Sequence, residues 1–154
     1  MGAAFHSRDG QRGTAIIEFT IALPVLLLLL AATAEIGRML SQYDTLNKSV
    51  RDGARYLAAN ALLGTTGVVS IDSTVQTATV NLVVTGNSAG TGTALLPNLT
   101  AGNVTVASLA NGYVSVSAAY TYVPMLGAQI PTFGLTAPIN TSVTLNASVV
   151  MRPL

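Results

Sequence analysis

The stretch that decides the fold is residues 13–34, GTAIIEFTIALPVLLLLLAATA, an apolar run interrupted by one acid, Glu18. The segment from Thr14 to Ala34 rises about 31 Å as an α-helix, close to the roughly 30 Å hydrocarbon core of a bilayer. A carboxylate inside such a span costs about 2.5–3.5 kcal/mol at mid-membrane and less near its edge. The sequence therefore predicts a transmembrane helix over 14–34 in which Glu18 needs a compensating partner.

The residues before the span form a short polar leader, MGAAFHSRDGQRG, which contains Arg8 and Arg12. No comparably dense basic cluster follows the span directly, and basic residues favour the cytoplasmic side of a membrane. We therefore expect a cytoplasmic N-terminus and an extracytoplasmic location for the rest of the chain.

Composition excludes several classes of function. The net charge of +1 and the charged fraction of 8% disfavour a nucleic-acid binder, which gathers Lys and Arg on one face. The chain has no cysteine, and its one histidine, His6, lies in the leader without a second ligand nearby. No nucleophile is accompanied by a histidine base and no glycine-rich phosphate loop is present. The sequence therefore predicts no enzyme, catalytic residue, metal site, cofactor or small-molecule substrate.

Two further features of the helix carry structural predictions. Pro24 lacks an N–H and leaves the Thr20 carbonyl without its helical donor, which predicts a kink. Such a proline is ordinary in membrane helices, and it equally suits a bend that assists packing or exit from the bilayer. Glu35 and Arg38 are spaced to pair where the helix leaves the membrane, either as a routine interfacial ion pair or as a subunit contact.

Beyond the span the helix is expected to continue to about Leu63, with Asp44 and Lys48 paired on its polar face and Gly64 as its C-terminal cap. Apolar residues recur at spacings of three and four and predict one buried stripe. The stripe consists of Ile36, Met39, Leu40, Tyr43, Leu46, Val50, Ala54, Leu57 and Ala61.

The remaining chain is expected to cover that stripe. Residues 70–85 fit either a helix or a strand, and we favour a helix because Ser73 to Gln76 resembles a capping box and Gly86-Asn87 follows. Residues 86–103 are expected to form a loop. Alternating Val, Thr, Tyr and Ser then predict antiparallel strands over 104–107, 113–123 and 142–151. Asn111-Gly112 is a hairpin signal, and Pro124, Pro131 and Pro138 predict an irregular connection between the last two strands.

The predicted fold class is therefore α+β: a long transmembrane and amphipathic helix followed by a small antiparallel domain of three to four strands. We expect four regions, namely a leader (1–13), a transmembrane helix (14–34), its extracytoplasmic continuation (35–63) and a β-rich domain (64–154).

The junction of leader and span resembles a type IV prepilin signal, with Gly13 before the cut, Thr14 after it and Glu18 as the fifth residue of the product. Residues 12–58 resemble more closely the TadE-like segment of the tight-adherence (Flp) pilus system. That resemblance implies a type IV pilin-like structural protein of the bacterial inner membrane, a minor pilin or pseudopilin. It also implies prepilin peptidase and other pilins as partners, and a Glu18 that neutralises the amine of a neighbouring subunit.

Two other readings remain open. The first is a secreted β-rich protein, because Ala32-Thr-Ala34 fits the small-x-small pattern of a signal peptide cut after Ala34. That reading gives Glu18 no purpose and leaves the apolar stripe on a free helix. The second is an uncleaved single-pass anchor of another envelope complex, which differs only in the fate of the leader.

Overall fold

A computed structural model of the chain describes residues 9–62, 67–125, 127, 129–130, 139–140 and 142–154. Several predictions fall outside these residues: the first eight residues of the leader with His6, the cap at Gly64, and the two prolines 131 and 138. The chain divides into two compact units, Met1–Gly37 and Arg38–Leu154, which are described separately below.

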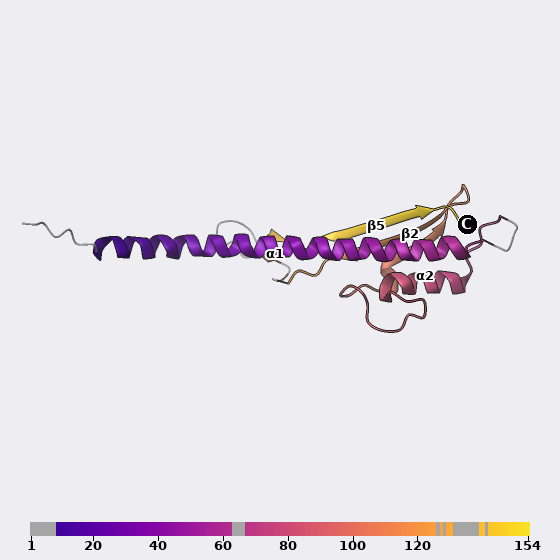
Figure 1. The fold of residues 1–154 in the computed structure, drawn as a ribbon, viewed down its shortest axis with the longest axis horizontal. Coiled ribbons are helices and arrows are strands. Elements are labelled where there is room, and N and C mark those ends of the chain that lie inside the picture. The colour runs from indigo at the N-terminus through magenta and orange to yellow at the C-terminus, as the bar shows by residue number, and fades with distance from the viewer. Residues whose placement is uncertain (1–8, 63–66, 126, 128, 131–138, 141) are drawn as a thin grey trace, which may run out of the picture. The chain divides into compact units, whose positions relative to one another are not determined.

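The helix α1 extends over Asp9–Asn60 (Figure 1). It begins at Asp9, within the leader and before the predicted start of the span at Thr14, and it ends before the predicted Leu63. Its last carbonyls lack partners inside the helix, as at any helix C-terminus. The Leu154 amide donates to the Ala58 carbonyl at 3.1 Å, so the chain end after the final strand satisfies one of them.

In the first unit α1 presents apolar side chains all round. Ile16, Phe19, Leu23 and Leu30 are all exposed within this unit. Pro24 has no N–H to donate to the Thr20 carbonyl. The Thr20 hydroxyl does not replace this donor, because it donates to the Ile16 carbonyl at 2.8 Å instead. Pro24 itself lies inside α1, and the kink there stays a prediction.

The second unit contains a three-stranded antiparallel sheet of order β1-β2-β5. The strands are β1 (Val104–Ser108), β2 (Val114–Thr121) and β5 (Thr144–Met151), each within two residues of its predicted bounds. A separate two-stranded sheet joins β3 (Gln129–Ile130) to β4 (Ile139–Asn140) within the predicted irregular connection. The predicted α+β class is confirmed.

The hairpin between β1 and β2 forms at the predicted Asn111-Gly112. The Leu109 amide donates to the Tyr113 carbonyl at 2.7 Å and the Gly112 amide donates to the Leu109 carbonyl at 3.2 Å. Gly112 adopts φ +74°, a left-handed conformation that glycine enters without a Cβ penalty.

The ambiguous segment before the loop is a helix, α2 (Ser73–Thr85), as favoured from the sequence. Its cap differs from the prediction: Asp72, not Ser73, is the N-cap and accepts a 2.8 Å hydrogen bond from the Ser73 amide. Hydrogen bonds from the Thr74 hydroxyl and the Ser73 amide hold the pKa of the Asp72 carboxyl below its ordinary value. Gly86, at φ +79°, closes the other end as a left-handed C-cap.

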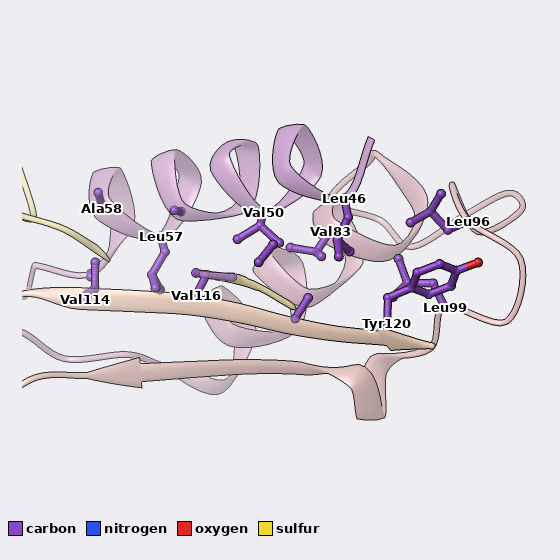
Figure 2. Close-up of a cluster of buried hydrophobic side chains, with 14 of the residues drawn as sticks. Leu46, Val50, Leu57, Ala58, Val83, Leu96, Leu99, Val114, Val116 and Tyr120 are labelled. Atoms are coloured by element: carbon purple, nitrogen blue, oxygen red, sulfur yellow. The ribbon is translucent and has the colours of Figure 1, made fainter. Parts of the chain in front are cut away.

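The core of the second unit lies between α1, α2 and the inner face of the sheet. Figure 2 shows Leu57 of α1 above Val116 of β2, and Ala58 above Val114. At the other end of β2, Tyr120 lies beside Leu99 of the long loop. The loop thus contributes two buried side chains to the core, Leu96 and Leu99, although its sequence predicts only a connection between secondary-structure elements.

The predicted stripe on α1 is buried over only part of its length. Leu46, Val50, Ala54, Leu57 and Ala61 are all buried, and Met39 is partly buried against the core. Ile36, Leu40 and Tyr43 instead remain 54%, 58% and 40% exposed. For these three residues the prediction of burial is wrong, because periodicity records which residues are apolar and not where a covering layer ends.

The two helices of the second unit approach each other closely at Gly53. A Cβ built on Gly53 lies 2.6 Å from Val83 Cγ2 and 3.4 Å from the Thr79 carbonyl oxygen. Val83 is fully buried and β-branched, so its side chain has little freedom to move aside. Gly53 is therefore a packing requirement at a helical position where alanine has the higher intrinsic propensity.

We predict that Gly53→Ala destabilises the second unit. The gain in helix propensity, about 1 kcal/mol, is outweighed by an overpacking cost of about 1–3 kcal/mol. The measurement is the urea midpoint of the full chain in detergent. Gly102→Ala is the control, because its new methyl meets only Thr100 Oγ1 at 3.8 Å and stability should change little. A stabilised Gly53→Ala protein would contradict the close contact.

Candidate functional site

The candidate site begins at the Gly13–Thr14 peptide, which lies inside α1. The helix starts at Asp9, so this bond is near its first turns, where local opening costs least. A peptidase that attacks an extended bond requires the helix to unwind here. Glycine is about 1 kcal/mol less favourable than alanine in a helix, so Gly13 makes local unwinding at this bond less costly.

Glu18 shares one helix surface with the residue that would become the new N-terminus. Thr14, Ile17, Glu18 and Ile21 line one shallow groove, and Ala22 and Val25 continue it. Residues four apart on a helix have their Cβ atoms about 5–6 Å apart. A free amine on Thr14 would therefore lie within reach of its own Glu18 as well as open to a neighbouring chain.

No hydrogen bond or ion pair to the Glu18 carboxylate is formed within the part of the chain that the structure describes. The groove around it is lined by apolar and small side chains, none of which offers a positive charge. In a bilayer an isolated carboxylate in such surroundings is costly. Glu18 therefore still needs the compensating partner that the sequence predicts.

Another side of the same helix carries a row of large apolar side chains. Phe19, Leu23, Leu27 and Leu30 follow one another at spacings of four, four and three, and all are exposed. Glu18 lies on another surface of the helix, among Thr14, Ile17, Ile21, Ala22, Val25 and Leu26.

The described residues contain one helix long and apolar enough to cross a membrane, within Gly13–Asn60. None of its most apolar window is buried by other parts of the chain. That combination of length and exposure fits a membrane-anchored protein.

Glu35 and Arg38, the predicted interfacial pair, are both half-buried. Their pairing stays a prediction, and Arg38 also has a neighbour that the sequence did not indicate. Burial raises the pKa of the Tyr120 hydroxyl, and the positive charge of Arg38 partly offsets this pKa shift.

A buried hydrogen bond between α1 and the sheet was also missed from sequence. The Tyr120 hydroxyl donates to Gln42 Oε1 at 2.9 Å, and both residues are buried. Gln42 follows Arg38 by one helical turn, but a polar residue beside an apolar stripe usually reads as exposed surface. Only its pairing with a residue 78 positions later makes its burial favourable.

Charges in the second unit lie mainly on α1. Lys48 pairs with Asp44 at 2.7 Å, as predicted, and Arg55 lies 3.9 Å from Asp52. Across the described residues, no group of three or more His, Cys, Asp or Glu side chains gathers to hold a metal ion.

Comparison with known proteins gives one match. Residues 13–55 match the family model described as TadE-like protein. The resemblance predicted from sequence is therefore confirmed over the segment that contains Gly13, Glu18, Pro24, Glu35 and Arg38. The match indicates a component related to the Tad pilus. Neither the curated proteins nor the solved structures contain a significant match.

We predict that Tyr120→Phe destabilises the second unit by about 1–3 kcal/mol, because the buried Gln42 oxygen loses its donor. Replacing both partners, as Tyr120→Phe with Gln42→Leu, should cost less than the sum of the single changes. Denaturant unfolding of the four proteins in detergent measures the coupling. Tyr113→Phe, at an exposed tyrosine, is the control and should change little. Strictly additive effects would contradict the hydrogen bond.

Proposed function

We propose that this chain, whose residues 13–55 match the TadE-like family, is a minor pilin or pseudopilin in the assembly of a tight-adherence (Flp) pilus. Its role is structural: α1 packs against other pilins and the small domain lies outside the membrane. The observation that carries the proposal is the single Glu18 carboxylate within an exposed apolar helix, five positions after Gly13.

Processing supplies the missing partner of Glu18 in this proposal. Prepilin peptidase cuts the Gly13–Thr14 bond, and the Thr14 nitrogen becomes an ammonium group at the membrane surface of the helix. Pairing this ammonium with a carboxylate removes two costly charges from lipid together. Within one chain Thr14 and Glu18 keep the free subunit neutral, and in the assembly the Glu18 of one subunit accepts the amine of the next.

The proposed topology follows the charge distribution. Arg8 and Arg12 hold the leader (1–13) in the cytoplasm, residues 14–34 cross the bacterial inner membrane, and residues 35–63 and 64–154 lie in the periplasm or outside the cell. Pro24 bends the span, and Glu35 with Arg38 marks the membrane boundary. The proposed partners are the membrane, prepilin peptidase and other pilins or pseudopilins.

We propose no enzymatic activity, cofactor or small-molecule substrate. A catalytic site needs several cooperating groups in one concave region. In the described residues the charged side chains lie mostly along α1, and the strands β1, β2 and β5 carry none. This distribution supports a structural role.

The first test identifies the N-terminal residue of the mature protein isolated from its own cells. We expect Thr14. A protein that begins at Glu35 would instead indicate a signal peptide cut after Ala34, and an intact Met1 would indicate an uncleaved anchor. Gly13→Leu should retain the leader, because the substitution changes the residue at the cut and favours the helical form of the bond.

The second test separates the role of Glu18 in assembly from any role in cleavage. Glu18→Ala should still be cut after Gly13 but should give no assembled pili, because the neighbouring amine loses its partner. Glu18→Gln keeps the size of the side chain without its charge and should fail in the same way.

Thr20→Ala is the matched control, since it removes a polar group that is already satisfied within the helix. It should be processed and assembled normally. Pilus counts by electron microscopy and the mass of the mature chain are the measurements. Normal pili from Glu18→Ala would overturn the proposed amine–carboxylate pairing.

A further inference from the structure

The strand β2 runs back along α1 toward the end of the second unit where α1 enters it. Val114, at the start of β2, lies beside Ala58, whereas the Tyr120 hydroxyl at the other end reaches Gln42 (Figure 2). Gln42 is one helical turn after Arg38, the first residue of the unit. The Tyr122 amide donates to the Val143 carbonyl at 2.9 Å, so the residues before β5 lie at the same end.

Exposed apolar side chains gather at this end of the unit, and we call them the entry rim. Each is between 36% and 77% exposed, and none carries a charge. The entry rim consists of Leu40 and Tyr43 of α1, Val123 and Met125 after β2, and Val143 before β5. Exposed apolar residues are ordinary when they are scattered singly, whereas a group of them indicates a contact surface.

The span fixes the distance of the entry rim from the bilayer. Leu40 follows Ala34, the end of the predicted span, by six residues, or about 9 Å of helix. The headgroup layer extends about 5–8 Å beyond the hydrocarbon core. Side chains on a helix lean toward its N-terminus, and in α1 this direction is toward the span. The methyl groups of Leu40 therefore reach the level of the lipid headgroups.

The ends of two strands lie on the same side of the unit as Leu40. Val123 follows Tyr120 by three residues, or about 10 Å of extended chain. It therefore lies beyond the Gln42 turn, in the direction of Arg38. Val143 accompanies it through the backbone hydrogen bond to Tyr122. Side chains from α1 and from the sheet thus surround the end of the unit that is joined to the span.

We propose that the entry rim lies in the headgroup layer of the bilayer that α1 crosses, where phospholipid covers its apolar side chains. Lipid is the partner because α1 continues without a break from the apolar span into the entry rim. Aliphatic side chains enter the boundary between headgroups and acyl chains, and Tyr43 suits the interface at which tyrosine is enriched. The inference rests on the proposed membrane anchoring, and it goes beyond the role of Glu18.

The opposite end of the sheet provides an internal comparison. Leu109, in the turn between β1 and β2, is 43% exposed, as is Val143. It lies at the Ala58 end of α1, and Ala58 is 18 residues, or about 27 Å of helix, beyond Leu40. The proposal therefore places Leu40 and Val143 in lipid and Leu109 in water, although all three are exposed apolar residues.

Fluorescence quenching of the full, uncleaved chain in vesicles tests this placement, since the natural sequence contains no cysteine. Leu40→Cys, Val143→Cys and Leu109→Cys each carry an environment-sensitive dye. The vesicles contain phosphatidylethanolamine and phosphatidylglycerol, with a nitroxide on the headgroups of both leaflets, so the orientation of the inserted chain does not matter. We expect several-fold stronger quenching at positions 40 and 143 than at 109. Equal quenching at all three positions, or none at the entry rim, would overturn the proposal.

Dilution separates lipid from a second copy of the chain as the cover of the entry rim. Quenching by lipid should not change when the chains are diluted to fewer than one per vesicle. A dye that is shielded only in crowded vesicles, and that the lipid nitroxide does not quench, would show that another chain covers the entry rim, against the proposal.

A charge placed in the entry rim gives a second measurement. With the dye at Leu40→Cys, Val123→Asp should reduce the quenching by about twofold, because a carboxylate resists entry into the bilayer. Leu109→Asp is the matched control and should leave the quenching unchanged. The urea midpoint in detergent checks that both variants fold. Unchanged quenching with Val123→Asp would show that Val123 does not enter lipid, against the proposal.

The two proposals fail separately in these assays. Flotation of the vesicles reports whether the chain is anchored, and it does not depend on cleavage at Gly13. A chain that floats with an unquenched entry rim would overturn only the contact between the entry rim and lipid. A chain that does not float would overturn the membrane anchoring, and this contact with it.

Discussion

The packing of one face of α1 against the inner row of β2 is the contact on which the second unit depends. Leu46, Val50 and Leu57 are fully buried there, opposite Val114, Val116 and Tyr120. Burial of such side chains supplies most of the stability available to a domain of this size, at about 1.5–3 kcal/mol for each fully buried large apolar residue. The sheet, α2 and the long loop all close around this one helical face.

The same helix serves two environments because its sequence changes along its length. Between residues 13 and 34 its surface is largely apolar and Glu18 is its one charged residue, as in a lipid-exposed segment. From Leu46 onward an apolar stripe alternates with the charged ridge of Asp44, Lys48, Asp52 and Arg55, as in water. In lipid a single carboxylate needs a specific partner, whereas in water the surface ion pairs contribute little. The chemical significance of a charge in this chain therefore depends on its position along α1.

The second unit combines a charged helical ridge with a sheet that carries no charge. Short polar residues such as Thr144, Asn146 and Ser148 are exposed on the outer row of the sheet and keep that face polar. Short uncharged side chains allow a neighbouring chain to approach the backbone, and they offer no repulsion against an identical copy.

The sequence by itself determined the local elements, because each depends on a short-range signal: the apolar span, the 3.6-residue stripe from Leu46 to Ala61, the Asn111-Gly112 turn and the alternating strands. It also determined the position of Glu18 relative to Gly13, on which the proposed function rests. Only the tertiary structure decided which apolar residues are covered, so Tyr43 stays exposed while Leu96 of the loop is buried. The Gln42–Tyr120 hydrogen bond and the close approach at Gly53 likewise join residues far apart in the chain. Periodicity and turn signals act over a few residues, whereas burial depends on what distant segments place against each side chain.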